Sequence, residues 1–203
     1  GERSTSVDVW YPSRASDAAA HLYGWDSWGF YGGALQDTPP DCSEPRPVMV
    51  HSHGNNSIRW EMFWLSEYAA THGWIVVAAD HLGNTFVDDV ADYATLIAQR
   101  PVEVRAAYDW LLAQVQREDH PLHGCVDPDS GYVVSGYSFC GYTAYVTGGA
   151  TTAMGLEGLA DERVTAVVTY APWDAQTLVE GTADIQVPVM SLGGDRDATV
   201  GTD

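Results

Sequence analysis

The chain of 203 residues is long enough to bury one sizeable core, and its 45% apolar and 11% aromatic content is that of a globular protein. It carries 28 acidic and nine basic residues, every one of the nine an arginine, for a net charge of −19. This charge disfavours nucleic acid and anionic membrane surfaces as partners, and no apolar run is long enough to span a membrane.

Short valine-rich runs recur along the chain and are typical of strands buried on both faces of a parallel sheet. The predicted strands are residues 7–11, 48–51, 74–79, 132–135, 164–170 and 187–192. The predicted helices are residues 58–71, 102–116 and 139–147, and we assign their Trp and Tyr side chains to the core. Residues 11–47, rich in Gly, Pro and aromatic residues, predict surface loops or an irregular edge. The alternation predicts an α/β fold with helices on both faces of a mostly parallel sheet.

The strongest local motif is Gly-Tyr-Ser-Phe-Cys-Gly at residues 136–141, between a predicted strand and a predicted helix. A serine on a sharp strand-to-helix turn projects its hydroxyl, and the helix N-terminus supplies free N–H groups and positive potential. The motif therefore predicts that Ser138 is a nucleophile. The pattern Gly-x-Ser-x-Gly has a glycine where this chain has Cys140, a residue small enough for the turn to tolerate.

A second motif, His-Ser-His-Gly-Asn-Asn at residues 51–56, marks the end of the predicted strand 48–51. Beside a nucleophile of this kind, one amide that binds the oxyanion belongs to the next residue, here Phe139. The other comes from the loop after an earlier strand, here Asn55. Because no third ligand has suitable spacing, the histidines of this motif predict no metal site. We expect neither a metal nor an organic cofactor.

These motifs are followed in order by Ala-Asp-His-Leu-Gly-Asn-Thr at residues 79–85 and Gly-Gly-Asp-Arg-Asp-Ala-Thr at residues 193–199. From about residue 7 to 199 the chain resembles α/β hydrolases, in the branch of bacterial platelet-activating-factor acetylhydrolase-like, dienelactone-hydrolase-like and cutinase-like polyester hydrolases. The resemblance implies a serine carboxylic-ester hydrolase that forms an acyl-enzyme on lipid-like or polyester substrates. The alternatives are a peptidase, a lactone hydrolase or a catalytically inactive binding protein.

The resemblance also implies a triad acid after a late strand. Asp197 stands where cutinase-like enzymes keep this aspartate, whereas acetylhydrolase relatives place it one strand earlier, which makes Asp174 the alternative. Either would orient a histidine and stabilise its charged form. Trp173 resembles the residue that forms a wall of the acyl or aromatic subsite, with core packing as the alternative. Further aromatic residues that indicate an apolar acyl or aryl group are Trp25, Trp28, Phe30 and Tyr31.

The general base is missing from its expected place, because triad order in this fold is serine, acid, histidine. The seven histidines all precede Ser138: His21, His51, His53, His72, His81, His120 and His123. We expect residues 1–203 to be one domain truncated before the catalytic histidine, which a cleaved C-terminal segment or a second chain would supply. Recruitment of His53 or His81 is the alternative.

Two cysteines precede strands that are parallel neighbours in this fold. Cys42 lies shortly before the strand at 48–51 and Cys125 shortly before that at 132–135, so their ends should be close enough for a disulfide. Such a bond predicts a secreted or periplasmic protein, and two free thiols are the alternative. Cys140 is expected to be an inert small residue.

Overall fold

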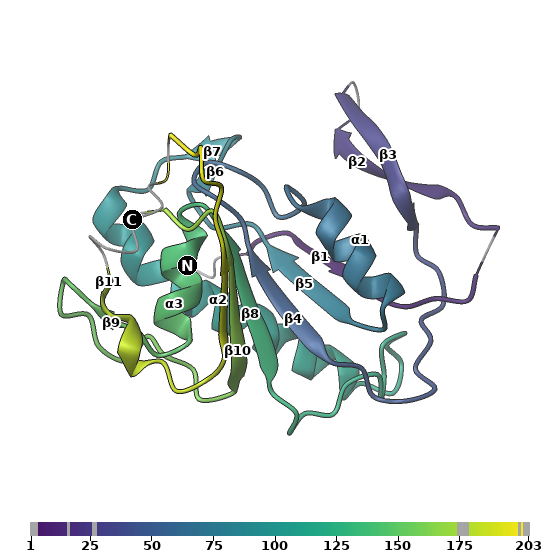
Figure 1. The fold of residues 1–203 in the computed structure, drawn as a ribbon. Helices are drawn as coiled ribbons and strands as arrows, with labels where there is room; N and C mark the ends of the chain where they lie inside the picture. The colour runs from purple at the N-terminus through teal and green to yellow at the C-terminus, as the bar shows by residue number, and fades with distance from the viewer. Residues whose placement is uncertain (1–3, 16, 26–27, 174–178, 199, 201–203) are drawn as a thin grey trace.

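A computed structural model describes residues 4–15, 17–25, 28–173, 179–198 and 200, apart from the side chain of Trp25 (Figure 1). Its main sheet contains, in spatial order, β1 (Val7–Trp10), β5 (Ile75–Ala79), β4 (Val48–Ser52), β8 (Tyr132–Tyr137), β10 (Val164–Tyr170) and β12 (Val189–Leu192). Only the pair of β1 with β5 is antiparallel within this sheet. The predicted α/β fold with a mostly parallel sheet is confirmed.

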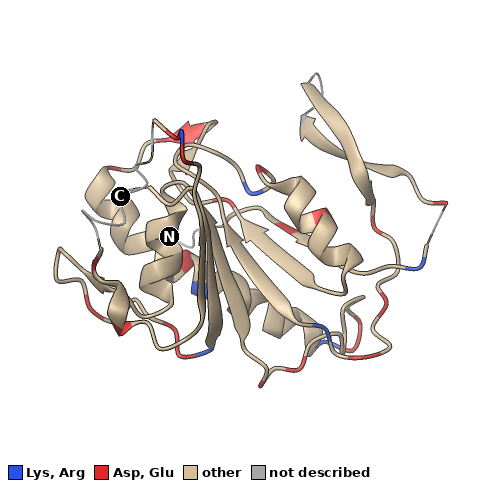
Figure 2. Ribbon diagram, in the orientation of Figure 1, with Lys and Arg blue, Asp and Glu red and all other residues tan. Residues whose placement is uncertain are grey.

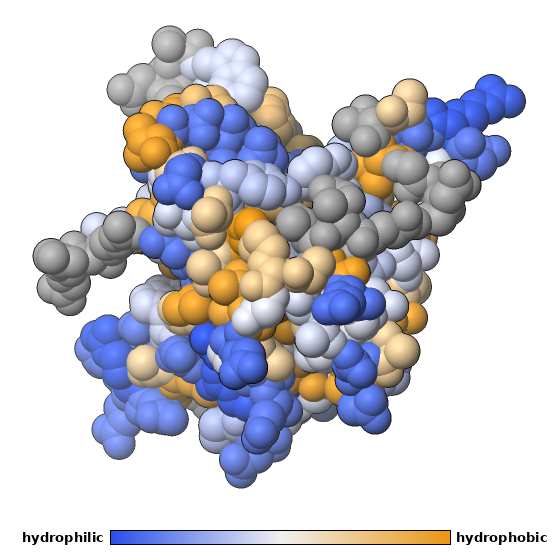
Figure 3. All heavy atoms as spheres, turned by 90° about the vertical axis from the view of Figure 1, so that its left-hand side faces the viewer, coloured by the Kyte–Doolittle hydropathy of each residue, from blue (hydrophilic) through white to orange (hydrophobic). Residues whose placement is uncertain are grey.

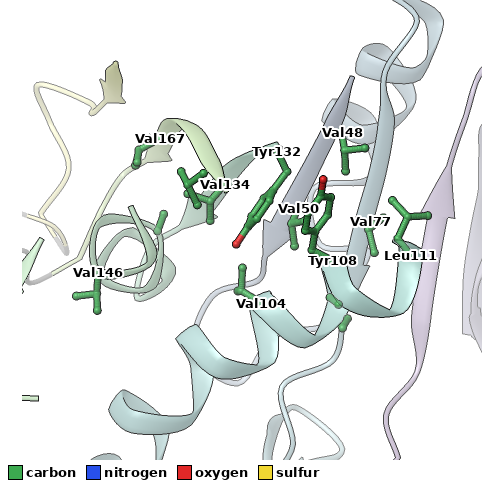
Figure 4. Packing of buried hydrophobic residues seen from close by; sticks show 14 of the residues in the cluster. Val48, Val50, Val77, Val104, Tyr108, Leu111, Tyr132, Val134, Val146 and Val167 are labelled. Carbon is green, nitrogen blue, oxygen red and sulfur yellow. The ribbon is translucent and has the colours of Figure 1, made fainter. Parts of the chain in front are cut away.

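The strands alternate their side chains between two cores. Val48 and Val50 of β4 face the larger core with α2 (Tyr93–Val115) and α3 (Cys140–Thr147), whereas Met49 between them faces the smaller core. The smaller core lies on the other face of the sheet, under α1 (Phe63–Thr71). Figure 4 shows the larger core, where valines of the sheet meet one side of α2 and the rings of Tyr108 and Tyr132 pack 4.3 Å apart.

Helix α2 begins nine residues before the predicted start at 102. Asp92 caps it by accepting a hydrogen bond from the Thr95 N–H at 2.9 Å, and the helix then runs through Pro101. Proline has no N–H for the carbonyl four residues earlier, that of Ile97. The hydroxyl of Tyr142 on α3 donates to this carbonyl at 3.1 Å, so a side chain replaces the missing backbone bond.

Residues 11–47 contain a hairpin of β2 (Ala20–Trp25) and β3 (Trp28–Leu35), so the prediction of loops or an irregular edge is wrong for this part. The hairpin packs over α1, where Phe30 contacts Phe63. The assignment of all helix aromatics to the core is also wrong, because Trp64 and Tyr68 are 56% and 63% exposed. Their spacing of four places them on one outward face of α1.

The other elements are short. They are β6 (Asn84–Thr85), β7 (Asp88–Asp89), β9 (Thr151–Thr152), β11 (Val179–Gly181) and the 3-10 helix η1 (Thr182–Asp184). Acidic residues are spread over loops and helix surfaces, and basic ones are few (Figure 2). The side formed by α3 and the β9–β11 pair has apolar residues in its middle with hydrophilic ones around them (Figure 3). None of the described helices is long and apolar enough to cross a membrane.

Cys42 and Cys125 form a disulfide with a Cα–Cα distance of 4.6 Å, as predicted. The bond closes a sequence separation of 83 residues. A cross-link over such a length stabilises the fold by about 4 kcal/mol, mainly by restricting the unfolded chain.

Reduction of this disulfide is therefore expected to lower the urea midpoint of unfolding substantially. The measurement compares the chain with and without reductant. The double variant Cys42→Ala/Cys125→Ala is the control, because its midpoint should already be low and should not respond to reductant. Equal midpoints for the oxidised chain and the double variant would contradict the prediction.

Candidate active site

Ser138 lies between the end of β8 and the start of α3, in the left-handed region of backbone conformation at φ +55°. A non-glycine residue adopts this conformation only at a cost that the surrounding structure must offset. Here the Ser138 N–H donates to the Tyr170 carbonyl at 3.0 Å, and the Ser138 carbonyl accepts from Gly141 and Trp173, both at 2.8 Å. The side chain is partly exposed.

Two glycines allow this turn to close. A Cβ on Gly136 would overlap the carbonyl of Cys140, and one on Gly141 would overlap the backbone of Pro172. The glycine required after Ser138 is thus Gly141, one position later than in the pattern Gly-x-Ser-x-Gly. Cys140 is fully buried under the turn.

Replacing Gly141 by alanine is expected to cost about 2–3 kcal/mol of unfolding free energy, because the new methyl group would overlap Pro172 backbone atoms. Gly193→Ala is a suitable control, since a Cβ there would meet no atom within 4 Å. Chemical denaturation of both variants checks the difference. A Gly141→Ala variant as stable as the control would show that Pro172 can move away freely.

The loop after β4 lies against the turn. A Cβ built on Gly54 would be 3.5 Å from the Cβ of Ser138, which places this loop beside the serine. Within the described part of the chain, the backbone N–H groups of Phe139 and Asn55 have no hydrogen-bond acceptor. Phe139 directly precedes α3, so the positive end of the helix dipole raises the positive potential at its N–H. One free amide donor thus follows Ser138 directly, and the other follows Gly54 in the loop that lies against it.

The carboxyl ends of β8, β10 and β12 meet at one edge of the sheet, since these strands are parallel neighbours. Asp197 follows β12, and one of its carboxylate oxygens accepts the Val200 N–H at 2.9 Å. Asp174 follows β10 but lies outside the described residues. Trp173 is partly buried, 5.7 Å from the Phe139 ring and 6.2 Å from the Tyr93 ring, measured between ring centroids.

A family model described as PETase, PET hydrolase-like, matches residues 18–202. The chain belongs to the PET hydrolase-like family. A ferulic acid esterase from Streptomyces cinnamoneus has the same fold, with a TM-score of 0.65 and 22% identity over 92% of this chain and 56% of that chain. This PET hydrolase-like chain therefore spans little more than half the length of the esterase chain. None of the curated proteins matches its sequence. The expected resemblance to α/β hydrolases of the polyester-hydrolase branch is confirmed.

In this PET hydrolase-like chain no histidine forms a hydrogen bond with Ser138 among the described contacts. His53 is buried, donates from Nδ1 to the Gly54 carbonyl at 2.9 Å, and accepts the His81 N–H at Nε2. His81 lies between Ser52 and Glu103, with both side-chain contacts at 2.7 Å. The recruitment of His53 or His81 as the base therefore has no support.

The group Ser52, His81 and Glu103 has the connectivity of a catalytic triad but is closed to substrate. Ser52 is 1% exposed and His81 is 2% exposed. Burial, with Arg100 nearby, holds the pKa of His81 well below its usual range, so the imidazole is neutral and donates from Nδ1 to the Glu103 carboxylate. These hydrogen bonds join the ends of β4 and β5 to helix α2 in the interior of the protein.

Two further side chains, one buried and one partly buried, have strongly shifted pKa values. Burial lowers the pKa of His51 to about 4, and its Nδ1 contacts the Ser135 hydroxyl at 2.9 Å. Burial raises the pKa of Glu61 to about 7, although its carboxylate accepts the Gly54 N–H at 2.5 Å. The 3.9 Å approach of His51 Nε2 to Glu61 has the distance of a salt bridge, but the neutral imidazole makes it a polar contact only.

The aromatic residues beside Ser138 differ from those expected. Trp28 and Tyr31 are exposed on the β2–β3 hairpin and Phe30 packs over α1, so the described contacts do not bring them to the serine. Tyr93, at the start of α2, instead contacts the Phe139 ring at a centroid distance of 5.4 Å. Sequence reasoning missed Tyr93 because it placed the start of this helix too late. The side chain of Trp25 lies outside the described residues.

Proposed function

We propose that the protein is a serine carboxylic-ester hydrolase that acts through an acyl-enzyme formed on Ser138. The observation that carries the proposal is the Ser138 turn itself, at φ +55°, together with the amides of Phe139 and Asn55, which have no acceptor among the described residues. In this mechanism the Ser138 hydroxyl attacks the ester carbonyl, and the two amides stabilise the resulting oxyanion. The alcohol then leaves, and water hydrolyses the acyl-enzyme.

The proton transfers require a base that none of the described contacts provides. We propose that a histidine on a cleaved C-terminal segment or a second chain accepts the Ser138 proton, with residues 1–203 forming one domain. Asp197 would orient it, with Asp174 as the alternative acid. Edge strand β12 supports this proposal. It exposes Val189, Met190 and Leu192, and a further segment could cover this apolar strand.

The proposed substrates are esters with apolar acyl or aryl groups, as in a polyester or a lipid-like ester. Membership of the PET hydrolase-like family supports a polyester. The exposed Tyr93 and the partly buried Trp173 pack around the buried Phe139 ring, next to the nucleophile, and offer surfaces on which an aryl group can stack. The disulfide supports a secreted or periplasmic location, and the net charge of −19 argues against anionic partners.

The experiment tests the full-length protein that contains these residues with p-nitrophenyl butyrate and a fluorophosphonate probe. We expect ester turnover and covalent labelling that peptide mapping assigns to Ser138. A panel with a matched anilide and a lactone distinguishes an esterase from a peptidase or a lactone hydrolase. A folded full-length protein that neither turns over the ester nor reacts with the probe would contradict the proposal and favour a binding protein.

A further inference from the structure

Arg100 on α2 is fully buried, and its guanidinium contacts backbone carbonyls rather than a carboxylate. It donates from Nη1 to the His53 carbonyl at 2.7 Å and from Nη2 to the Gly54 carbonyl at 3.0 Å. The charges of Glu103 and Glu61 favour the guanidinium from a distance, but among the described residues no carboxylate forms a salt bridge with it, and burial lowers its pKa. Burying a cation without such a partner is costly. We therefore ask which groups Arg100 holds in place and what they could do.

The first of these groups is the peptide that carries the Asn55 amide. In a planar trans peptide the C=O of one residue and the N–H of the next point in opposite directions, and the described chain has no cis peptide. Since the Gly54 carbonyl points to Arg100, the Asn55 N–H points away from it. Arg100 also donates to the side-chain oxygen of Asn84, whose Nδ2 donates in turn to the side-chain oxygen of Asn55 at 3.1 Å.

The second group is the start of α3. The Arg100 guanidinium lies over the Phe139 ring, 4.9 Å from its centroid, and Nη1 also contacts the Cys140 sulfur. A planar guanidinium can stack on a ring and donate at its edge at the same time, which a lysine ammonium cannot do. One side chain therefore spans from the loop after β4 to the residue that follows Ser138.

We propose that Arg100 is a positioning residue that holds the Asn55 and Phe139 amides in the arrangement needed to bind an oxyanion. This inference rests on the proposed function, because it concerns the same reaction at Ser138. Glu61 holds the loop from its other side by accepting the Gly54 N–H. The loop is thus fixed at a carbonyl by the buried Arg100 and at an N–H by the partly buried Glu61, so the amides need not reorganise when charge develops.

The test compares Arg100→Lys with Arg105→Lys in the full-length protein. Arg105 lies on the same helix, but its guanidinium bonds the Gly158 and Ala160 carbonyls far along the chain from the site. Each variant is assayed with an ester and with the matching thionoester. In the thionoester a sulfur atom carries the developing negative charge, and amide donors stabilise this charge less than they stabilise it on oxygen. For Arg100→Lys we expect kcat on the ester to fall about tenfold to a hundredfold with little change in KM.

The ratio of ester to thionoester kcat gives the readout that a merely structural role would not move. We expect this ratio to fall at least severalfold in Arg100→Lys and to stay constant in Arg105→Lys. Asn84→Ser provides a second variant, since it removes the link to Asn55 and leaves Arg100 in place. Its ratio should also fall, which keeps the test decisive if Arg100→Lys does not fold.

An unchanged ratio in Arg100→Lys, or in Asn84→Ser where the first variant is unfolded, would overturn the inference while leaving the proposed esterase intact. A wild-type protein that turns over neither substrate would instead overturn the proposed function. The two failures are therefore distinguishable.

Discussion

Replacement of Ser138 by alanine is expected to lower kcat/KM of the full-length protein for an ester on the order of ten-thousand-fold, because the attacking hydroxyl is lost. Fluorophosphonate labelling should disappear with it. The fold should be retained, since the backbone bonds of the turn remain available to alanine. Steady-state kinetics and circular dichroism of the variant check both parts, and turnover near the wild-type level would exclude Ser138 as the nucleophile.

The same position offers a stability test of backbone strain. Ser138→Gly should also be inactive, but it should be more stable than Ser138→Ala by about 1 kcal/mol, because glycine accepts φ +55° without a Cβ clash. The matched pair is Ser130→Gly and Ser130→Ala, at an exposed residue whose φ is not positive. There the order should reverse, since glycine adds entropy to the unfolded chain. The same order at both positions would argue against strain at Ser138.

Acidification from pH 7.5 to pH 4.5 is expected to lower the free energy of unfolding by several kcal/mol. The buried imidazoles of His51, His53 and His81 have pKa values below the usual 6.5, so the unfolded chain binds protons first. Their contribution is present above pH 6.5 and is lost as the pH falls towards the folded pKa. For His51, with a folded pKa of about 4, it amounts to roughly 3 kcal/mol.

Glu61 acts in the opposite direction. Its raised pKa of about 7 means that the folded state binds this proton first, so its ionisation costs stability as the pH rises from about 4.5 to 7. The effect is comparable to that of His51 alone, and the contributions of His53 and His81 leave a net loss of stability in acid. Glu61→Gln should therefore steepen the loss of stability on acidification.

Urea unfolding at four pH values between 4.5 and 7.5 measures these slopes. His51→Asn keeps a group near Nδ1 for Ser135 and should flatten the dependence, whereas His123→Asn alters an exposed histidine and should not. A stability that is constant over this range in both the wild-type protein and Glu61→Gln would show that the buried imidazoles are protonated without cost.

The sheet could be predicted from sequence because its strands are buried on both faces, so valine-rich runs such as those in β4 and β5 have no polar alternation to obscure them. The start of α2 could not, since Pro101 resembles a helix breaker. The hydrogen bond that replaces the one missing at Pro101 comes from Tyr142, which is 41 positions later in the chain. The β2–β3 hairpin was missed because its glycines weaken the alternating pattern of a strand.

The position of Ser138 could be predicted because the turn, the strand and the helix are adjacent in sequence. Arg100 could not, because one arginine on an amphipathic helix is usually exposed, and its burial depends on where α2 meets the loop after β4. The choice between Asp197 and Asp174 depends on a histidine that the described contacts do not supply. Local sequence thus defines the proposed nucleophile, whereas long-range packing defines the residues that orient the groups around it.

The disulfide ties the chain just before β4 to the chain just before β8, while the loop of Gly54 and the turn of Ser138 follow the opposite ends of the same two strands. The two strands pair along their length between the cross-link and the edge of the sheet at Ser138. Reducing conditions should therefore shorten the lifetime of the folded chain without moving the groups around Ser138.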